Sequence, residues 1–223
     1  SSDVCSSDLS LRLGKELGNA PWIHRTKWPE GWLPIDTYEQ RVDTIAEFKY
    51  EQDWETLRQG IIENGGIRNS TLIAHMPTES SSKASGIPNG FYPIRDYTLA
   101  KTDNNLKLDW APTEGDRLKR HYEIAWDIPY IDMIECYGIL QKFTDQSISA
   151  DQWARLEGDS AVYADRLLDT VVQMARYGVK TRYYFNSKTS QTIVDERTGE
   201  ERTLEVIVEH SVSDKCASGG CDA

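Results

Sequence analysis

The chain has 223 residues, of which 39% are hydrophobic, and this is enough to bury the core of one domain or of two small ones. Its 25 basic residues against 36 acidic ones give a net charge of −11, so it lacks the basic face that binding to DNA or RNA requires. No run of about 18 apolar residues predicts a membrane span, and the N-terminus has no signal-peptide pattern. These features predict a cytoplasmic protein.

The first third of the chain predicts an irregular segment, a helix and a short strand. Residues 10–36 are rich in Pro, Gly and Trp without a clear period, which is typical of an irregular packed segment. Residues 37–64 carry apolar side chains near helical spacing and end at Gly65-Gly66, a helix stop. The apolar run TLIAHM, residues 71–76, has the length of a buried strand.

The segment PTESSSKAS, which follows this strand, predicts the start of a helix. Pro77 with Thr78 or Glu79 is favourable at a helix N-terminus, and three serines follow. A strand that leads into a helix presents unpaired backbone N–H groups and a partial positive charge, so a phosphate could bind there. The alternative is that Thr78 or Ser80 only caps the helix. No Gly-Lys pair accompanies the segment, so it is not a P-loop.

The second half of the chain alternates between strands and helices. Residues 86–111 combine strand-forming residues with turn signals, which predicts a hairpin. Helices are predicted around residues 117–125 and 131–143. The strongest helical pattern covers residues 163–180, where five apolar side chains share one face and Gly178 ends the helix. This order of elements indicates an α/β architecture.

Two adjacent tyrosines lie in the strand that follows, TRYYF. In a regular strand Tyr183 and Tyr184 would point to opposite faces, so the simplest interpretation is one core and one surface tyrosine. Further on, the runs TIV and LEVIVEH could pair as a hairpin across DERTGEER. The last dozen residues contain little that could be buried, which predicts a mobile tail.

The four cysteines are too few and too unevenly spaced for a disulfide scaffold. Cys136 lies in the apolar stretch IDMIECYGILQKF and is predicted to be a small buried core residue. Cys216 and Cys221 lie close together in the tail, which suggests redox or metal chemistry. A structural zinc ion would need four ligands, whereas the tail offers these two thiols and the distant His210.

Six segments occur in a fixed order along the chain: LPIDTY, RNSTL, MPTESSS, LQKFTDQSIS, YGVKTRYY and CASGGC. Together they closely resemble the C-terminal portion of the large (alpha) subunit of class I ribonucleotide reductase. The resemblance implies the C-terminal part of a ten-stranded α/β barrel over residues 10–186, and a flexible redox tail with a possible hairpin over residues 187–223. It also implies an enzyme that reduces ribonucleoside diphosphates to deoxyribonucleoside diphosphates by radical chemistry, for DNA replication.

The resemblance implies a role for each motif. The substrate diphosphate would be held by Pro77, Thr78, Glu79, Ser80 and Ser81. Glu79 would contribute mainly its backbone N–H, because its carboxylate repels a diphosphate.

The tyrosines and the tail thiols would carry the redox chemistry. Tyr183 and Tyr184 would be a stacked pair that relays an oxidising equivalent, and stacking requires a local departure from regular strand geometry. Cys216 and Cys221 would re-reduce an active-site disulfide, and this implied thiol shuttle is favoured over a zinc site.

The resemblance places the cofactors outside this chain and implies several partners. A metal-radical cofactor would belong to the small (beta) subunit, and ATP or dNTP effectors would bind at sites absent here. Partners would be the ribonucleoside diphosphate, the beta subunit, thioredoxin or glutaredoxin, and a second alpha subunit. Neither nucleic acid nor a membrane is expected. The location would be the cytoplasm, or the host cytoplasm for a viral protein.

This chain has no counterpart to the family's thiyl-radical cysteine, so we expect it to be a fragment that is inactive alone. The alternatives are a naturally split subunit and a non-catalytic module that docks the beta subunit. Residues 1–9, SSDVCSSDL, match the translation of a common sequencing-library adapter. We therefore expect those nine residues to be an artefact rather than protein sequence.

Overall fold

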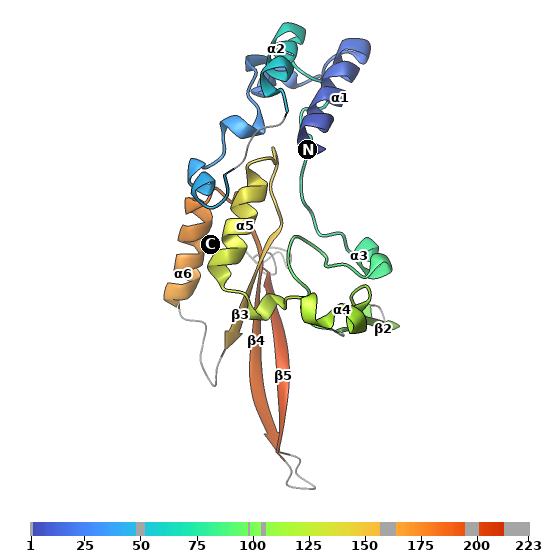
Figure 1. The fold of residues 1–223 in the computed structure, drawn as a ribbon, viewed down its shortest axis with the longest axis vertical. Helices are drawn as coiled ribbons and strands as arrows, with labels where there is room; N and C mark the ends of the chain where they lie inside the picture. The colour runs from blue at the N-terminus through green and yellow to red at the C-terminus, as the bar shows by residue number, and fades with distance from the viewer. Residues whose placement is uncertain are drawn as a thin grey trace, which may run out of the picture. The chain divides into compact units, whose positions relative to one another are not determined.

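The computed structural model describes residues 2–47, 52–97, 99–103, 106–156, 164–194 and 201–211 (Figure 1). The chain divides into two compact units. Unit 1 comprises Ser1–His75, Glu135–Ile148 and Met174–Lys180, and unit 2 comprises Met76–Ile134, Ser149–Gln173 and Thr181–Ala223.

Two helices, α1 (Ser2–Leu17) and α2 (Trp54–Asn64), lie side by side in unit 1 (Figure 1). The Asp53 carboxylate caps α2 by accepting the Thr56 N–H at 2.9 Å, and Gly65 ends the helix in the left-handed conformation. Between α1 and α2 the described residues form short 3-10 helices at Ile23–Arg25, Trp28–Glu30, Pro34–Asp36 and Gln40–Thr44. The core of these elements consists of Leu11, Trp28, Leu33, Trp54, Leu57, Ile61 and Ile67.

Three expectations for this region need correction. Residues 10–17 belong to α1 instead of an irregular segment, and the helix expected over residues 37–64 begins only at Trp54. The run 71–76 forms a single parallel bridge, His75 to Ile148, instead of a strand. Its backbone N–H groups at Leu72 and Ile73 donate to the Asp145 carboxylate, so a side chain takes the place of a neighbouring strand.

The helices α5 (Tyr130–Gln141) and α6 (Ala164–Arg176) confirm the two predicted near residues 131–143 and 163–180. Gly178, with φ 71°, follows α6 as expected. The buried face of α5 includes Met133, Ile134, Tyr137 and Gln141. Cys136 is exposed, which overturns its prediction as a core residue, because the helical period turns position 136 away from that face.

The described residues of unit 2 form two sheets. In the first sheet β3 (Ala150–Leu156) pairs parallel with β4 (Arg182–Val194), and β4 pairs antiparallel with β5 (Glu201–Ser211). The chain passes from β3 through α6 to β4, a β-α-β connection that agrees with the α/β expectation. The antiparallel pairing of β4 with β5 agrees with the predicted hairpin, but its register differs from the expectation: TIV pairs with residues 201–203, and LEVIVEH pairs with residues 185–191.

The second sheet is the hairpin of β1 (Leu99–Asp103) and β2 (Leu106–Trp110), which confirms the prediction for residues 86–111. The described residues of unit 2 also form short helical segments: α3 (Ser80–Ser85), α4 (Gly115–Leu118) and the 3-10 turns Lys119–His121 and Ala125–Asp127. The helix expected around residues 117–125 is therefore broken into short pieces. The buried rings of Tyr92 and Trp153 pack 4.6 Å apart and anchor β3 in the core of the unit.

Candidate functional site

The tyrosine pair lies at an irregularity of the parallel sheet. Ala150 pairs with Arg182 and Gln152 pairs with Phe185, so one residue of β3 faces two residues of β4. This is a β-bulge, in which the extra residue bends the strand and redirects a side chain. The residues on the bulged strand are Tyr183 and Tyr184, and the residue opposite them is Asp151. The departure from regular strand geometry that stacking requires is thus present.

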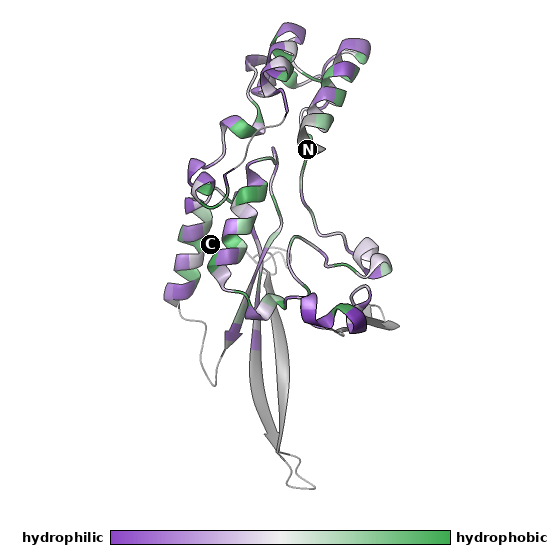
Figure 2. Cartoon of the chain, viewed as in Figure 1, coloured by the Kyte–Doolittle hydropathy of each residue, from purple (hydrophilic) through white to green (hydrophobic). Residues whose placement is uncertain are grey.

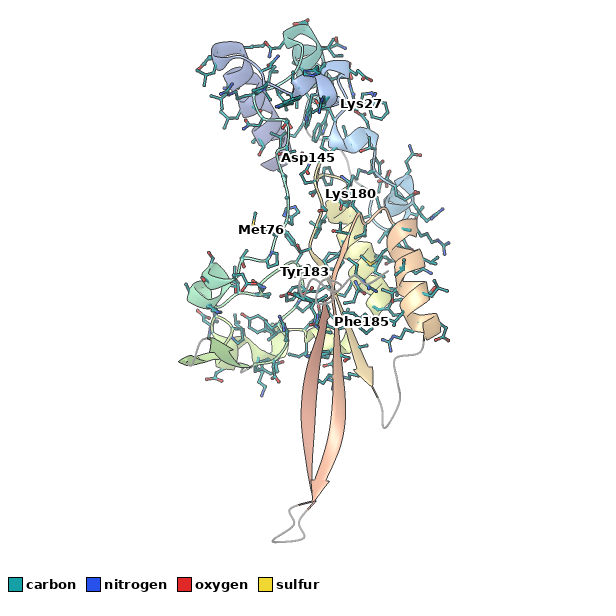
Figure 3. All side chains as sticks on the ribbon, turned by 180° about the vertical axis from the view of Figure 1, so that it is seen from behind. Lys27, Met76, Asp145, Lys180, Tyr183 and Phe185 are labelled. Carbon is teal, nitrogen blue, oxygen red and sulfur yellow. The ribbon has the colours of Figure 1, made fainter. Side chains whose placement is uncertain are left out.

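The bulge brings the two phenol rings together. Their centroids are 4.0 Å apart at an interplanar angle of 57°, and the Tyr183 hydroxyl donates to the Tyr184 oxygen at 3.3 Å. Both side chains are partly buried on β4, where Figure 3 labels Tyr183 beside Phe185. Tyr183 and Tyr184 therefore interact with each other instead of dividing between core and surface.

Asp151 holds the backbone of this bulge. Its Oδ1 atom accepts the Tyr184 N–H at 3.1 Å, and the residue is only 3% exposed. The hydrogen bond to Tyr184, burial, and the nearby carboxylates of Asp151 and Glu79 raise the pKa of Tyr183 to about 12. Tyr183 is therefore a neutral phenol at physiological pH, so its oxidation is far more favourable when the loss of the electron is coupled to loss of the hydroxyl proton.

The same electrostatic influence links the PTESS segment to the tyrosines. The Glu79 carboxylate makes a small contribution to the raised pKa of Tyr183, and the predicted substrate-binding segment and the predicted relay both belong to unit 2. Glu79 is also the N-cap position of α3 and has φ 44°, a value that is unusual outside glycine.

Asn89 fixes the start of α3 from the facing loop. Its Oδ1 accepts the Glu79 N–H at 2.5 Å, its Nδ2 donates to the Glu79 carboxylate at 3.4 Å, and its backbone carbonyl accepts the Thr78 N–H at 2.8 Å. The Glu79 N–H expected to bind a diphosphate thus donates to a protein acceptor. The hydroxyl-bearing Ser80 and Ser81 are exposed at the helix start.

The remaining predicted site residues are placed as follows. Pro77 precedes the loop that Asn89 holds, and neither Thr78 nor Ser80 makes a side-chain cap to α3. Cys216 and Cys221 lie outside the described residues. Among the residues that the structure describes, no group of three or more His, Cys, Asp or Glu side chains is arranged to hold a metal ion.

A separate cavity lies in unit 1 and contains none of the predicted site residues. It has a volume of about 270 Å³, and its lining includes Trp32 together with Lys27 and Asp145, the last two of which are labelled in Figure 3. Lys27 pairs with Glu30 at 2.9 Å, and Asp145 accepts backbone N–H groups, so both charges are used within the fold.

Sequence reasoning identifies the tyrosines and the PTESS segment but misses Asp151 and Asn89. An aspartate after SISA carries no signal by itself, because its role depends on the register between β3 and β4. Asn89 carries only the signal of a turn residue. A search for polar residues opposite the tyrosines in a parallel pairing would find Asp151.

The barrel domain of ribonucleotide reductase is the family whose model matches this chain, over residues 4–185, and the chain belongs to that family. It is 38% identical over 216 residues to ribonucleoside-diphosphate reductase 1 subunit alpha of Escherichia coli, which covers 95% of this chain and 27% of that protein. The subunit alpha of Haemophilus influenzae is also 38% identical, over 95% of this chain and 26% of the relative. That of Enterobacteria phage T4 is 32% identical over 187 residues, or 80% of this chain and 24% of the relative.

The chain therefore spans about a quarter of the length of the curated relatives it matches. The family match begins at residue 4, within the nine residues that match an adapter translation, and the assignment of those residues as an artefact stays a prediction. No helix in the described part of the chain is long and apolar enough to cross a membrane.

Proposed function

We propose that this chain is the C-terminal part of the large subunit of a ribonucleoside-diphosphate reductase, and that Tyr183 and Tyr184 are its radical relay. The observation that carries the proposal is the β-bulge that places the two phenol rings 4.0 Å apart with a hydrogen bond between them. The family match and the alpha-subunit relatives support the reaction class. In this proposal the chain alone is inactive, because it has no counterpart to the thiyl-radical cysteine.

The transfer between the tyrosines is a balanced exchange of one hydrogen atom. When Tyr184 has been oxidised to its phenoxyl form, Tyr183 gives an electron and its hydroxyl proton to the Tyr184 oxygen. The Tyr183 O–H bond breaks, the Tyr184 O–H bond forms, and the radical moves to Tyr183. The two hydroxyl oxygens lie 3.3 Å apart, within hydrogen-bond distance, so the proton has a short path between them.

The substrate of the proposed enzyme is a ribonucleoside diphosphate held by residues 77–81. The hydroxyls of Ser80 and Ser81 are the groups that we assign to the phosphate oxygens, because both residues are exposed at the start of α3. Thr78 and Glu79 shape the loop, since their N–H groups donate to Asn89. Loss of the Ser80 and Ser81 hydroxyls should raise the KM for the diphosphate more than it lowers kcat.

The partners follow from the proposed reaction. The oxidising equivalent comes from a small subunit that carries the metal-radical cofactor, a second large subunit completes the enzyme, and the site of action is the cytoplasm. Electrons reach the large subunit through Cys216 and Cys221 from thioredoxin or glutaredoxin by thiol-disulfide exchange.

Replacing both cysteines with Ser should abolish turnover with a protein dithiol donor yet spare it with dithiothreitol. Equal loss with both reductants would argue against a shuttle.

Phenylalanine substitutions test the relay directly. Tyr183→Phe and Tyr184→Phe each remove the transferable proton but keep most of the packing, so nucleotide reduction by the holoenzyme should be lost while substrate binding stays near normal. Tyr122→Phe is the matched control, because its hydroxyl donates to the Thr113 carbonyl at 2.7 Å and not to either tyrosine of the pair. A fully active Tyr184→Phe holoenzyme would overturn the relay.

A further inference from the structure

The contact between the two tyrosines depends on the β-bulge, where a single residue of β3 stands opposite two residues of β4. From Gln152–Phe185 to Leu156–Thr189 the parallel register of β3 and β4 is regular, and β4 stays in register with β5 from Tyr184–Ser211 onward. The irregularity is thus confined to the step opposite Asp151. In a regular strand consecutive side chains point to opposite faces, so without the bulge the two rings would separate.

At the bulge, the Tyr184 N–H donates its hydrogen bond to a side chain. An extra residue in a bulge has no ladder partner across the sheet, and a buried N–H without an acceptor is costly. Asp151 Oδ1 supplies that acceptor at 3.1 Å. Because Asp151 is only 3% exposed, its carboxylate cannot swing into solvent and has to be stabilised by groups inside the protein.

We propose that Asp151 is the positioning residue of the tyrosine pair: its carboxylate oxygen accepts the Tyr184 N–H and thereby fixes the bulge that brings the two phenols into contact. Asp151 does not exchange an electron or a proton with either tyrosine. Its role in catalysis rests on the relay proposed above, because Asp151 affects the reaction only by keeping the two phenol oxygens close together.

The test compares two substitutions at position 151 in the holoenzyme, that is, the complete large subunit with its small subunit. Asp151→Asn keeps an oxygen at the acceptor position and removes the charge. Asp151→Ala removes the acceptor. The matched control is Asp127→Ala. It breaks a 2.6 Å ion pair with Arg155, which lies on β3 like Asp151, but it leaves the residues of the bulge unchanged.

We expect Asp151→Ala to lower kcat for nucleotide reduction at least tenfold with KM changed less than twofold. Asp151→Asn should retain at least half of the activity, as should Asp127→Ala. A general loss of packing would reduce both position-151 variants alike, so rescue by Asn distinguishes positioning from structure. An active Asp151→Ala enzyme, or an Asp151→Asn enzyme as inactive as Asp151→Ala, would overturn the proposal.

Crystal structures of the variants separate this inference from the relay itself. The phenol oxygens, 3.3 Å apart here, should stay in contact in Asp151→Asn and move apart by more than 1 Å in Asp151→Ala. If the Tyr→Phe enzymes prove active, the relay fails, and these distances still decide whether Asp151 fixes the pair. If Asp151→Ala does not fold, Asp151→Asn decides alone: separated phenols in that variant contradict the inference.

Discussion

Tyr183 is an unusually weak acid because its neighbour stabilises the protonated form. The hydrogen bond to Tyr184 is the main reason that its pKa rises to about 12. We expect Tyr184→Phe to move the Tyr183 pKa back toward the ordinary value near 10. Carbon-13 tyrosine NMR across a pH series, with the Tyr183 signal assigned through Tyr183→Phe, measures this shift.

The sign of the accompanying stability effect is fixed by the direction of the shift. Since folding raises the Tyr183 pKa, the neutral phenol contributes stability that is fully present below about pH 10 and is lost as the pH rises through about 12. Tyr184→Phe should weaken this alkaline pH dependence. A Tyr183 pKa that is the same in both proteins would contradict the proposed contact.

Residues whose partners are close in the sequence could be identified from the sequence, whereas residues whose partners are far away in the sequence could not. The adjacency of Tyr183 and Tyr184 is local, so the need for a distorted strand could be predicted. Asp151 is more than 30 residues away, and only the register of the sheet brings it opposite the pair. The prediction for Cys136 was wrong for a different reason: an apolar sequence context does not fix which side of a helix faces the core.

At the scale of elements, two glycines end helices in the same backbone conformation but in different surroundings. Gly65 has φ 68° and open space where a methyl group would lie, whereas at Gly178, with φ 71°, a Cβ would lie 2.8 Å from the Glu39 Cβ. Gly65→Ala should therefore cost only the left-handed strain, about 1–2 kcal/mol. Gly178→Ala should cost about 1–3 kcal/mol more, because the overpacked neighbours must move.

Amide hydrogen exchange of the last turns of α2 and α6 in the large subunit measures the two costs separately. If Gly65→Ala and Gly178→Ala lower stability by the same amount, the contact between a Cβ at position 178 and Glu39 does not destabilise the protein.

The ion pair between Asp36 and Arg58 joins the turn Pro34–Asp36 to α2. Arg58 donates to both Asp36 oxygens, at 2.6 and 2.8 Å, and to the Gly31 carbonyl at 2.6 Å. This bidentate, half-buried geometry predicts that Arg58→Ala lowers the free energy of unfolding by about 2 kcal/mol. The control is Lys27→Ala, whose exposed pair with Glu30 should be worth less than about 0.5 kcal/mol.

The same pair predicts a pH dependence. The hydrogen bond from Arg58 lowers the pKa of Asp36 in the folded state below its ordinary value of 3.8. Its contribution is therefore present above pH 3.8 and is lost as the pH falls through the lowered pKa. Urea unfolding followed by tryptophan fluorescence at neutral and acidic pH should show the cost of Arg58→Ala shrinking in acid. A cost that is constant with pH would contradict the assignment.

Elements with strong local signals were predictable, and those defined by distant partners were not. The glycine stop after α2 and the amphipathic pattern of α6 depend on residues that are close together in the sequence. The run 71–76 has the composition of a strand, yet the Asp145 carboxylate replaces its strand partner. Composition cannot distinguish these two ways of pairing a backbone.

At the scale of the whole chain, helix α6 has an apolar face that is exposed to solvent. Leu168, Val171 and Val172 are 65%, 48% and 51% exposed, although the sequence places them on one hydrophobic face. Figure 2 shows the hydrophobic residues interspersed with hydrophilic ones along this helix. Within the described residues, β3 and β5 each pair only with β4, so both have an open edge. Such faces and edges promote association.

We therefore expect residues 10–223, expressed alone, to be poorly soluble and to aggregate at micromolar concentration. The double substitution Leu168→Glu with Val172→Glu should raise the soluble fraction severalfold, because it places charge on the exposed face of α6. Leu17→Glu, which adds one charge at a position on α1 that is 64% exposed, should change it little because it leaves the apolar face of α6 intact. Sedimentation and light scattering measure the outcome. A sharp, cooperative thermal transition of a monomer would contradict the expectation, since it would mean that the exposed face and the two sheet edges cost the isolated chain nothing.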